Sequence, residues 1–163
     1  MKAKWIGKHY TNMKHRIKNC CEERERLTNQ IELNRTLNIS EKRNIQKQTF
    51  GLFIKRDVLK KEIEHYQLFV SLVERGLNEI KSQTTNQSYM WFYENNFNQQ
   101  SQIDIAFSGE DEVSEKTVSR VVSQLNKTFI DQIELEVRAY FETDKTYREQ
   151  LKSIYKQAKL VVN

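Results

Sequence analysis

Three observations predict an all-α protein: helix-breaking residues are scarce, helix-favouring residues are common, and apolar residues recur at helical spacing. The chain of 163 residues contains no Pro and four Gly, and 30% of its residues are charged. Pro and Gly are the residues that a helix interior tolerates least, whereas Lys, Glu, Gln and Leu are accommodated well. Apolar residues recur every three or four positions over most of the chain. We therefore expect at least five helices and no sheet: a long helical hairpin or coiled coil, then a helix-turn-helix region and a C-terminal helix.

The N-terminal third is predicted to form one long helix. Its apolar stripe runs from Ile6 to Ile31 and weakens at Asn34. Residues 37–40 predict a bend, and Ser40 is a suitable cap for the following helix, since its hydroxyl can accept from the unpaired amides of the first turn.

The second long helix is predicted to begin near Glu41. Its stripe runs from Ile45 to Ile80, which at 1.5 Å per residue is a rod of roughly 50 Å. Gly51 and Gly76 interrupt it and mark bends or close packing. Two such helices form either an antiparallel hairpin or a coiled coil between chains, and a seam this long favours a homodimer.

Residues 82–88 are polar and uncharged and form the best candidate linker. They divide a first part, residues 1–81, with a basic arm and the long helical hairpin, from a second part, residues 89–163, with the helix-turn-helix region and C-terminal helices. The aromatic cluster at 89–93 is expected to be the core of that second part, because aromatic side chains dominate core burial.

The helix-turn-helix is predicted over residues 102–129. A short apolar helix ends at Ser108-Gly109, and Ser114 is the expected cap of a second helix whose apolar side reaches Phe129. The early residues of such a second helix meet base edges in DNA-binding proteins. The candidates for the major groove are Lys116, Ser119 and Arg120. Ser114 and Thr117 are the candidates for phosphate contacts. A plain helical hairpin is the alternative interpretation, and the turn at 110–112 is acidic.

Past Phe129 the apolar period continues to Phe141, and Thr143-Asp144 predict a break and a cap. A last helix then places Leu151, Ile154 and Tyr155 on one side. This side is a candidate docking surface for a protein partner or a second copy.

The charge is distributed unevenly. The net charge is +5, but residues 1–60 hold 15 Lys and Arg against 6 Asp and Glu, and residues 61–163 hold 12 against 16. The first eighteen residues carry six bases and no acid. Such a block is typical of contacts with phosphates or anionic lipid, with an ordinary solvated surface as the alternative. Lys4, Lys8 and Lys14 are the candidates for contacts with DNA phosphates.

Several function classes are disfavoured. No signal peptide or membrane span is recognised, and the adjacent Cys20 and Cys21 are expected to be free thiols in the cytoplasm. With His9 and His15 they fit no zinc spacing, so no metal is expected. The sequence has no glycine-rich phosphate loop, no HExxH and no GxSxG motif. We therefore expect neither an enzyme nor a cofactor.

The order of these segments resembles a known family. An aromatic segment ending in YENNF precedes QSQIDIAF and VSEKTVSRVVSQLNKTF, and this order is similar to the phage late-gene transcription regulators of the ArpU/RinA type. The resemblance implies a DNA-reading region like region 4 of sigma factors. Its "IA" helix would match Ile105-Ala106, and its reading helix would match Ser114, Thr117, Val118 and Arg120.

Two hypotheses follow. The first is a transcription regulator of a phage or mobile element that binds double-stranded DNA through the helix-turn-helix and the basic arm. The second is a non-enzymatic coiled-coil adaptor, scaffold or inhibitor that binds a protein partner. The basic arm and the SEKTVSR stretch favour the first, and the acidic lower half of the chain favours the second.

Overall fold

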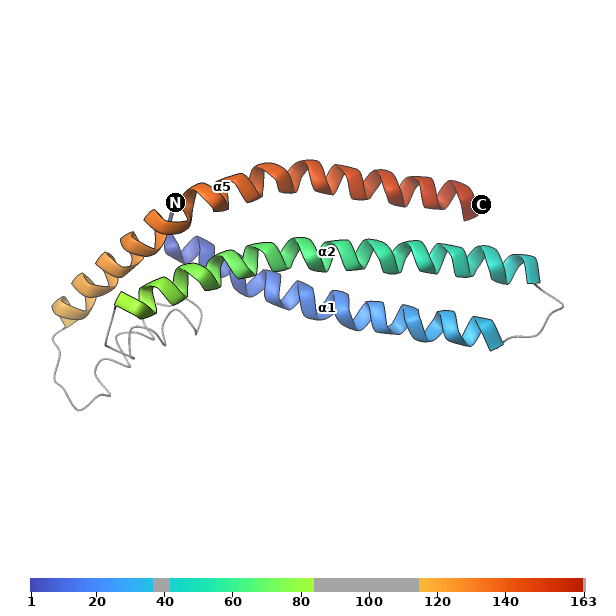
Figure 1. Cartoon of the computed structure of the whole chain (residues 1–163), viewed down its shortest axis with the longest axis horizontal. Coiled ribbons are helices and arrows are strands. Elements are labelled where there is room, and N and C mark those ends of the chain that lie inside the picture. The colour runs from blue at the N-terminus through green and yellow to red at the C-terminus, as the bar shows by residue number, and fades with distance from the viewer. Residues whose placement is uncertain (37–41, 84–114, 163) are drawn as a thin grey trace. The chain divides into compact units, whose positions relative to one another are not determined.

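The computed structural model describes residues 1–36, 42–83 and 115–162, and apart from the first two all of them are helical (Figure 1). The helices are α1 (Ala3–Thr36), α2 (Lys42–Gln83) and α5 (Glu115–Val162). No strand occurs among these residues. The predicted all-α class is confirmed, as are the two long helices in the first half of the chain.

Other expected features lie outside the described residues. These are the bend at 37–40, the aromatic cluster at 89–93, the first motif helix and turn up to Ser114, and the linker from residue 84 onward. Ser82 and Gln83, the first two linker residues, belong to the end of α2. The linker as a domain boundary stays a prediction, and so does the helix-turn-helix.

The predicted break at Thr143-Asp144 is wrong, because α5 continues through both residues. Thr143 donates from its hydroxyl to the carbonyl of Tyr140 at 2.9 Å, a bond that a residue inside a helix can make. Asp144 is buried, and its carboxylate accepts from Arg148 Nε one turn later at 2.7 Å. A residue type that often caps helices is here used for a side-chain contact in the helix interior.

The described chain divides into two compact units, and each contains segments of all three helices. The described part of unit 1 comprises residues 1–13, 68–83 and 115–139. Its buried apolar side chains come from all three segments: Ala3, Ile6 and Met13; Phe69, Val73, Leu77 and Ile80; Phe129, Ile133 and Val137. The described part of unit 2 comprises residues 14–36, 42–67 and 140–162. Its core contains Leu27, Ile31, Val58, Ile63, Tyr66, Tyr140 and Leu151.

Gly76 permits a close approach of α2 to α5 inside unit 1. A Cβ built on Gly76 would lie 2.8 Å from Cγ2 of Ile133 and 2.9 Å from Cε2 of Phe129. Both neighbours are fully buried. Of the two interpretations that the sequence allowed at this glycine, a bend or close packing, the structure supports close packing.

Candidate nucleic-acid interface

The basic arm is part of a helix that is packed on one side and exposed on the other. Ile6 and Met13 are buried in the core of unit 1, so they hold the first turns of α1 in place. Lys4 and Lys8 are exposed, and Trp5 keeps 41% of its surface accessible. The lysine side chains therefore project from an ordered support rather than from a free tail.

A surface hollow of about 490 Å³ follows this exposed side of α1. Among the described residues it is lined by Lys2, Lys4, Trp5, Lys8, Thr11 and Asn12. The Trp5 ring lies against the imidazole of His9, with centroids 4.2 Å apart. The described lining thus combines three cations, an aromatic ring and two uncharged hydrogen-bonding side chains with no carboxylate, which suits a sugar-phosphate backbone.

Ion pairs in the described part of unit 1 do not involve these lysines. The N-terminal amino group lies 3.7 Å from Glu134, Arg138 contacts the same carboxylate at 2.6 Å, and Arg75 pairs with Glu136. The hydrogen bond from Arg138 also lowers the pKa of Glu134. Within the described residues, Lys2, Lys4 and Lys8 form no ion pair. Their charge is therefore not neutralised by a described carboxylate.

The predicted reading helix is described only in part. Its residues from Glu115 onward are helical, and Arg120 is exposed. Lys116, Thr117 and Ser119 lie in the first turns of α5, where side chains are not described, and Ser114 lies outside the described residues. Glu134 is the residue of α5 that contacts the N-terminal amino group. Arg120 lies fourteen residues before it, which is about 21 Å along the helix. The exposed Lys14, the third predicted arm residue, belongs to unit 2.

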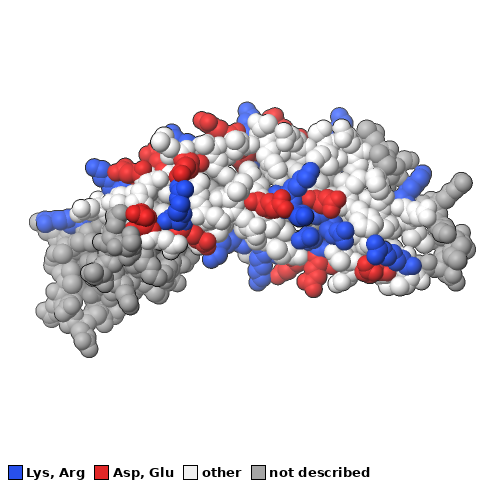
Figure 2. Space-filling view, in the orientation of Figure 1, with Lys and Arg blue, Asp and Glu red and all other residues white. Residues whose placement is uncertain are grey.

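The face of the described residues that Figure 2 shows is mixed in charge. In the view of Figure 2, basic and acidic side chains are interspersed, and no large area of one sign is visible among the described residues. Mixed surfaces of this kind serve solubility and give little attraction for a polyanion. The start of α1, with its exposed lysines beside Trp5, is the candidate for phosphate contact in the described part of unit 1.

The structure also brings together a buried polar cluster that sequence reasoning missed. His65 and Asp144 are 79 positions apart, yet Nε2 of the first lies 2.7 Å from Oδ1 of the second. The His65 ring stacks on Tyr140 and Tyr147, with centroids 4.6 and 4.2 Å away. Both partners of the pair are 8% exposed. No local motif signals such a pair, because the two residues meet only when α2 packs on α5 inside unit 2.

Burial shifts the ionisation of groups in unit 2. The pKa of Cys20 rises to about 11, through desolvation and then the charge of Glu62, whose Oε2 lies 3.9 Å from the sulfur. Burial raises the pKa of Glu62 itself. It also raises the pKa of Tyr147 to about 12, and the Tyr147 hydroxyl is buried without a hydrogen-bond partner among the described residues. These shifts favour the neutral form of each group.

Comparisons with protein-family models, with curated proteins and with solved structures find no match. In the described part of the chain, no helix is both long enough and apolar enough to cross a membrane. The same residues contain no group of three or more His, Cys, Asp or Glu that could hold a metal ion. The function is therefore inferred from the residues themselves.

Proposed function

We propose that this protein is a DNA-binding transcription regulator of a phage or mobile element, and that it binds double-stranded DNA as a homodimer. The observation that carries the proposal is the exposed basic side of α1, where Lys2, Lys4 and Lys8 surround Trp5 and form no ion pair among the described residues. Lysines in such a setting can release counterions from phosphates, which supplies most of the sequence-independent affinity for DNA.

Sequence selection is assigned to the start of α5. Arg120 is exposed there, and an Arg side chain can donate two hydrogen bonds to a guanine edge in the major groove. Lys116 and Ser119 lie on the same turns and are proposed to read neighbouring bases, with Ser114 and Thr117 at a phosphate. The similarity of VSEKTVSR to the reading helix of the ArpU/RinA-type regulators supports this assignment.

The role of α1 can be tested by the salt dependence of binding. Lys4→Gln with Lys8→Gln should weaken binding to every duplex alike and reduce the log–log salt slope by about 0.9 for each phosphate that is no longer neutralised. The matched control removes the same charge from exposed positions of α2, as Lys60→Gln with Lys61→Gln. Fluorescence anisotropy on a labelled duplex measures both. Equal salt slopes for the two double variants would show that Lys4 and Lys8 of α1 do not bind phosphates.

The reading helix can be tested by selection from random duplexes. The wild-type protein should enrich one sequence, and Arg120→Ala should weaken binding to that sequence by about 1–3 kcal/mol while leaving unrelated duplexes nearly unaffected. Lys145→Ala, an exposed site further along α5, is the control. If the folded wild-type protein enriches no sequence at low salt, the regulator proposal fails.

A second candidate function, the non-enzymatic adaptor, is favoured by a different observation. Leu68 and Leu135 of unit 1 are 64% and 83% exposed, which is unusual for large apolar side chains. The C-terminal surface expected for a protein partner is partly used already: Leu151 is buried in unit 2, whereas Ile154 and Tyr155 are half-buried. If the protein is an adaptor, Leu68→Ser or Leu135→Ser should abolish binding of the protein partner. The variants of Lys4, Lys8 and Arg120 should still bind that partner.

A further inference from the structure

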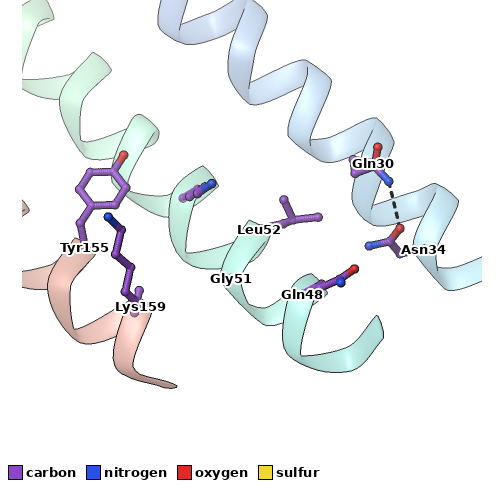
Figure 3. Close-up of a pocket in the computed structure, with 9 residues that line it drawn as sticks. Gln30, Asn34, Gln48, Gly51, Leu52, Tyr155 and Lys159 are labelled. Carbon is purple, nitrogen blue, oxygen red and sulfur yellow. Dashed lines mark hydrogen bonds between the residues drawn. The ribbon is translucent and has the colours of Figure 1, made fainter. Parts of the chain in front are cut away.

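A second hollow lies wholly within unit 2 and is independent of the DNA proposal. It has a volume of about 480 Å³ and is formed by all three helices (Figure 3). The view shows Gln30 and Asn34 of α1 on one side, Tyr155 and Lys159 of α5 on the other, and α2 between them. The size is that of a site for a small organic molecule, for which roughly 300–1,000 Å³ is usual.

One wall consists of amide groups held in a hydrogen-bond chain. Gln30 Nε2 donates to Asn34 Oδ1 at 3.0 Å, and Asn34 Nδ2 donates to Thr49 Oγ1 at 3.2 Å. Thr49 donates in turn to the carbonyl of Ile45 at 2.7 Å. The chain fixes the orientation of both amides, which lowers the entropy cost of a further hydrogen bond to a ligand.

The rest of the described lining consists of the amide of Gln48, apolar groups and two lysines. Leu52, Ala158 and the ring of Tyr155 are half-buried, and Gly51 leaves space where another residue would place a side chain. Lys55 and Lys159 are exposed.

The described lining contains no carboxylate. Lys55 lies close enough to Glu23 to lower its pKa, but that carboxylate is already bound by Arg26 at 2.6 Å. The main partner of the Glu23 carboxylate is therefore Arg26, which does not line the hollow. The described residues of the hollow thus present two cations beside an apolar surface.

We propose that this hollow is a binding site for a small organic anion with an apolar body. The body would lie against Leu52 and Tyr155, and its carboxylate or sulfonate would face Lys55 and Lys159. Charge complementarity decides this class: a neutral ligand would make no use of the two lysines, and a cation would be repelled by them. The amides of Gln30 and Asn34 would orient polar atoms of the ligand.

The test compares two fluorescent probes with the same rings, of which only one is charged. Anilinonaphthalene sulfonate carries the anion, and phenylnaphthylamine lacks it. Lys55→Gln with Lys159→Gln should weaken binding of the sulfonate by at least roughly tenfold, because the loss of even one hydrogen bond to a charged group has about that effect. Binding of the neutral probe should be unchanged. The matched control, Lys60→Gln with Lys152→Gln, removes two exposed lysines outside the hollow and should affect neither probe.

Filling the hollow should exclude both probes. Gly51→Leu does so from α2, and Ala158→Phe does so from α5, so one variant remains informative if the other does not fold. Circular dichroism and urea unfolding establish which variants are folded. The proposal is overturned if the folded wild-type protein does not bind the sulfonate, or if either a folded filling variant or the lysine double variant binds it as the wild type does.

Discussion

At the scale of single residues, the buried pair of His65 and Asp144 is the most consequential contact in unit 2. Asp144 also accepts from Arg148, so its carboxylate compensates two donors at once. If one partner of a buried polar pair is removed, the remaining partner stays buried without its hydrogen bond. The free-energy cost of that state is larger than the net stabilisation that the intact pair provides.

We therefore expect Asp144→Ala to lower the free energy of unfolding by about 3 kcal/mol, since breaking a buried pair typically costs that much. Glu142→Ala changes an exposed acid on the same helix and should alter stability by less than about 0.5 kcal/mol. Urea unfolding followed by circular dichroism compares the two. A similar small effect for both would mean that the cluster is not a stabilising element.

The half-buried Glu62 predicts a pH dependence. Its pKa is raised above 4.5 by desolvation, although the hydrogen bond from Cys20 and the charges of Arg148 and Arg16 oppose the shift. A raised pKa in the folded state favours the protonated form, so this residue contributes stability at acid pH that is lost as the pH rises through the folded-state pKa.

Replacing Glu62 by Gln removes that loss. Glu62→Gln should raise the melting temperature at pH 7, and its advantage over the wild type should disappear at about pH 4. Glu64→Gln, an exposed acid on the same helix, is the control and should show little pH-dependent difference. Scanning calorimetry at several pH values measures this. An advantage of equal size at both pH values would contradict the assignment to ionisation.

At the scale of elements, the two glycines of α2 have opposite environments. Gly76 faces Phe129 and Ile133 at less than contact distance for a Cβ, whereas Gly51 lies at the hollow of unit 2. Intrinsic helix propensity favours Ala over Gly at either site by about 1 kcal/mol, so packing decides the difference.

Gly76→Ala should therefore destabilise the protein by about 1–3 kcal/mol, because the added methyl forces apart buried side chains that cannot move freely. Gly51→Ala should be neutral or stabilising by up to about 1 kcal/mol. Chemical denaturation of both variants gives the comparison. Equal stabilisation by the two substitutions would show that α2 and α5 can separate without cost.

At the scale of the whole molecule, the proposed homodimer gives a prediction about self-association. The apolar stripes of α1 and α2 are largely buried within the two units, but Leu135 and Leu68 remain exposed in unit 1. DNA-reading proteins commonly pair on two half-sites. We expect sedimentation equilibrium at tens of micromolar to show a dimer, and Leu135→Ser to shift it toward monomer. A wild-type protein that is monomeric throughout that range would contradict the homodimer.

The sequence by itself determined the helical class, both long helices of the first half and the basic start of α1. These are properties of local periodicity, of the absence of Pro and of the order of charges, and none depends on contacts distant in the chain. The tertiary structure alone decided the rest. Asp144 resembles a helix cap in sequence, and the structure instead places it inside α5, where it contacts His65 and Arg148. From the sequence, Gly76 could mark either a bend or close packing. The structure decides for close packing, because Phe129 and Ile133 lie against it. The hollow between Gln30, Leu52 and Tyr155 exists only where three helices meet, because residues far apart in sequence acquire a common surface only through packing.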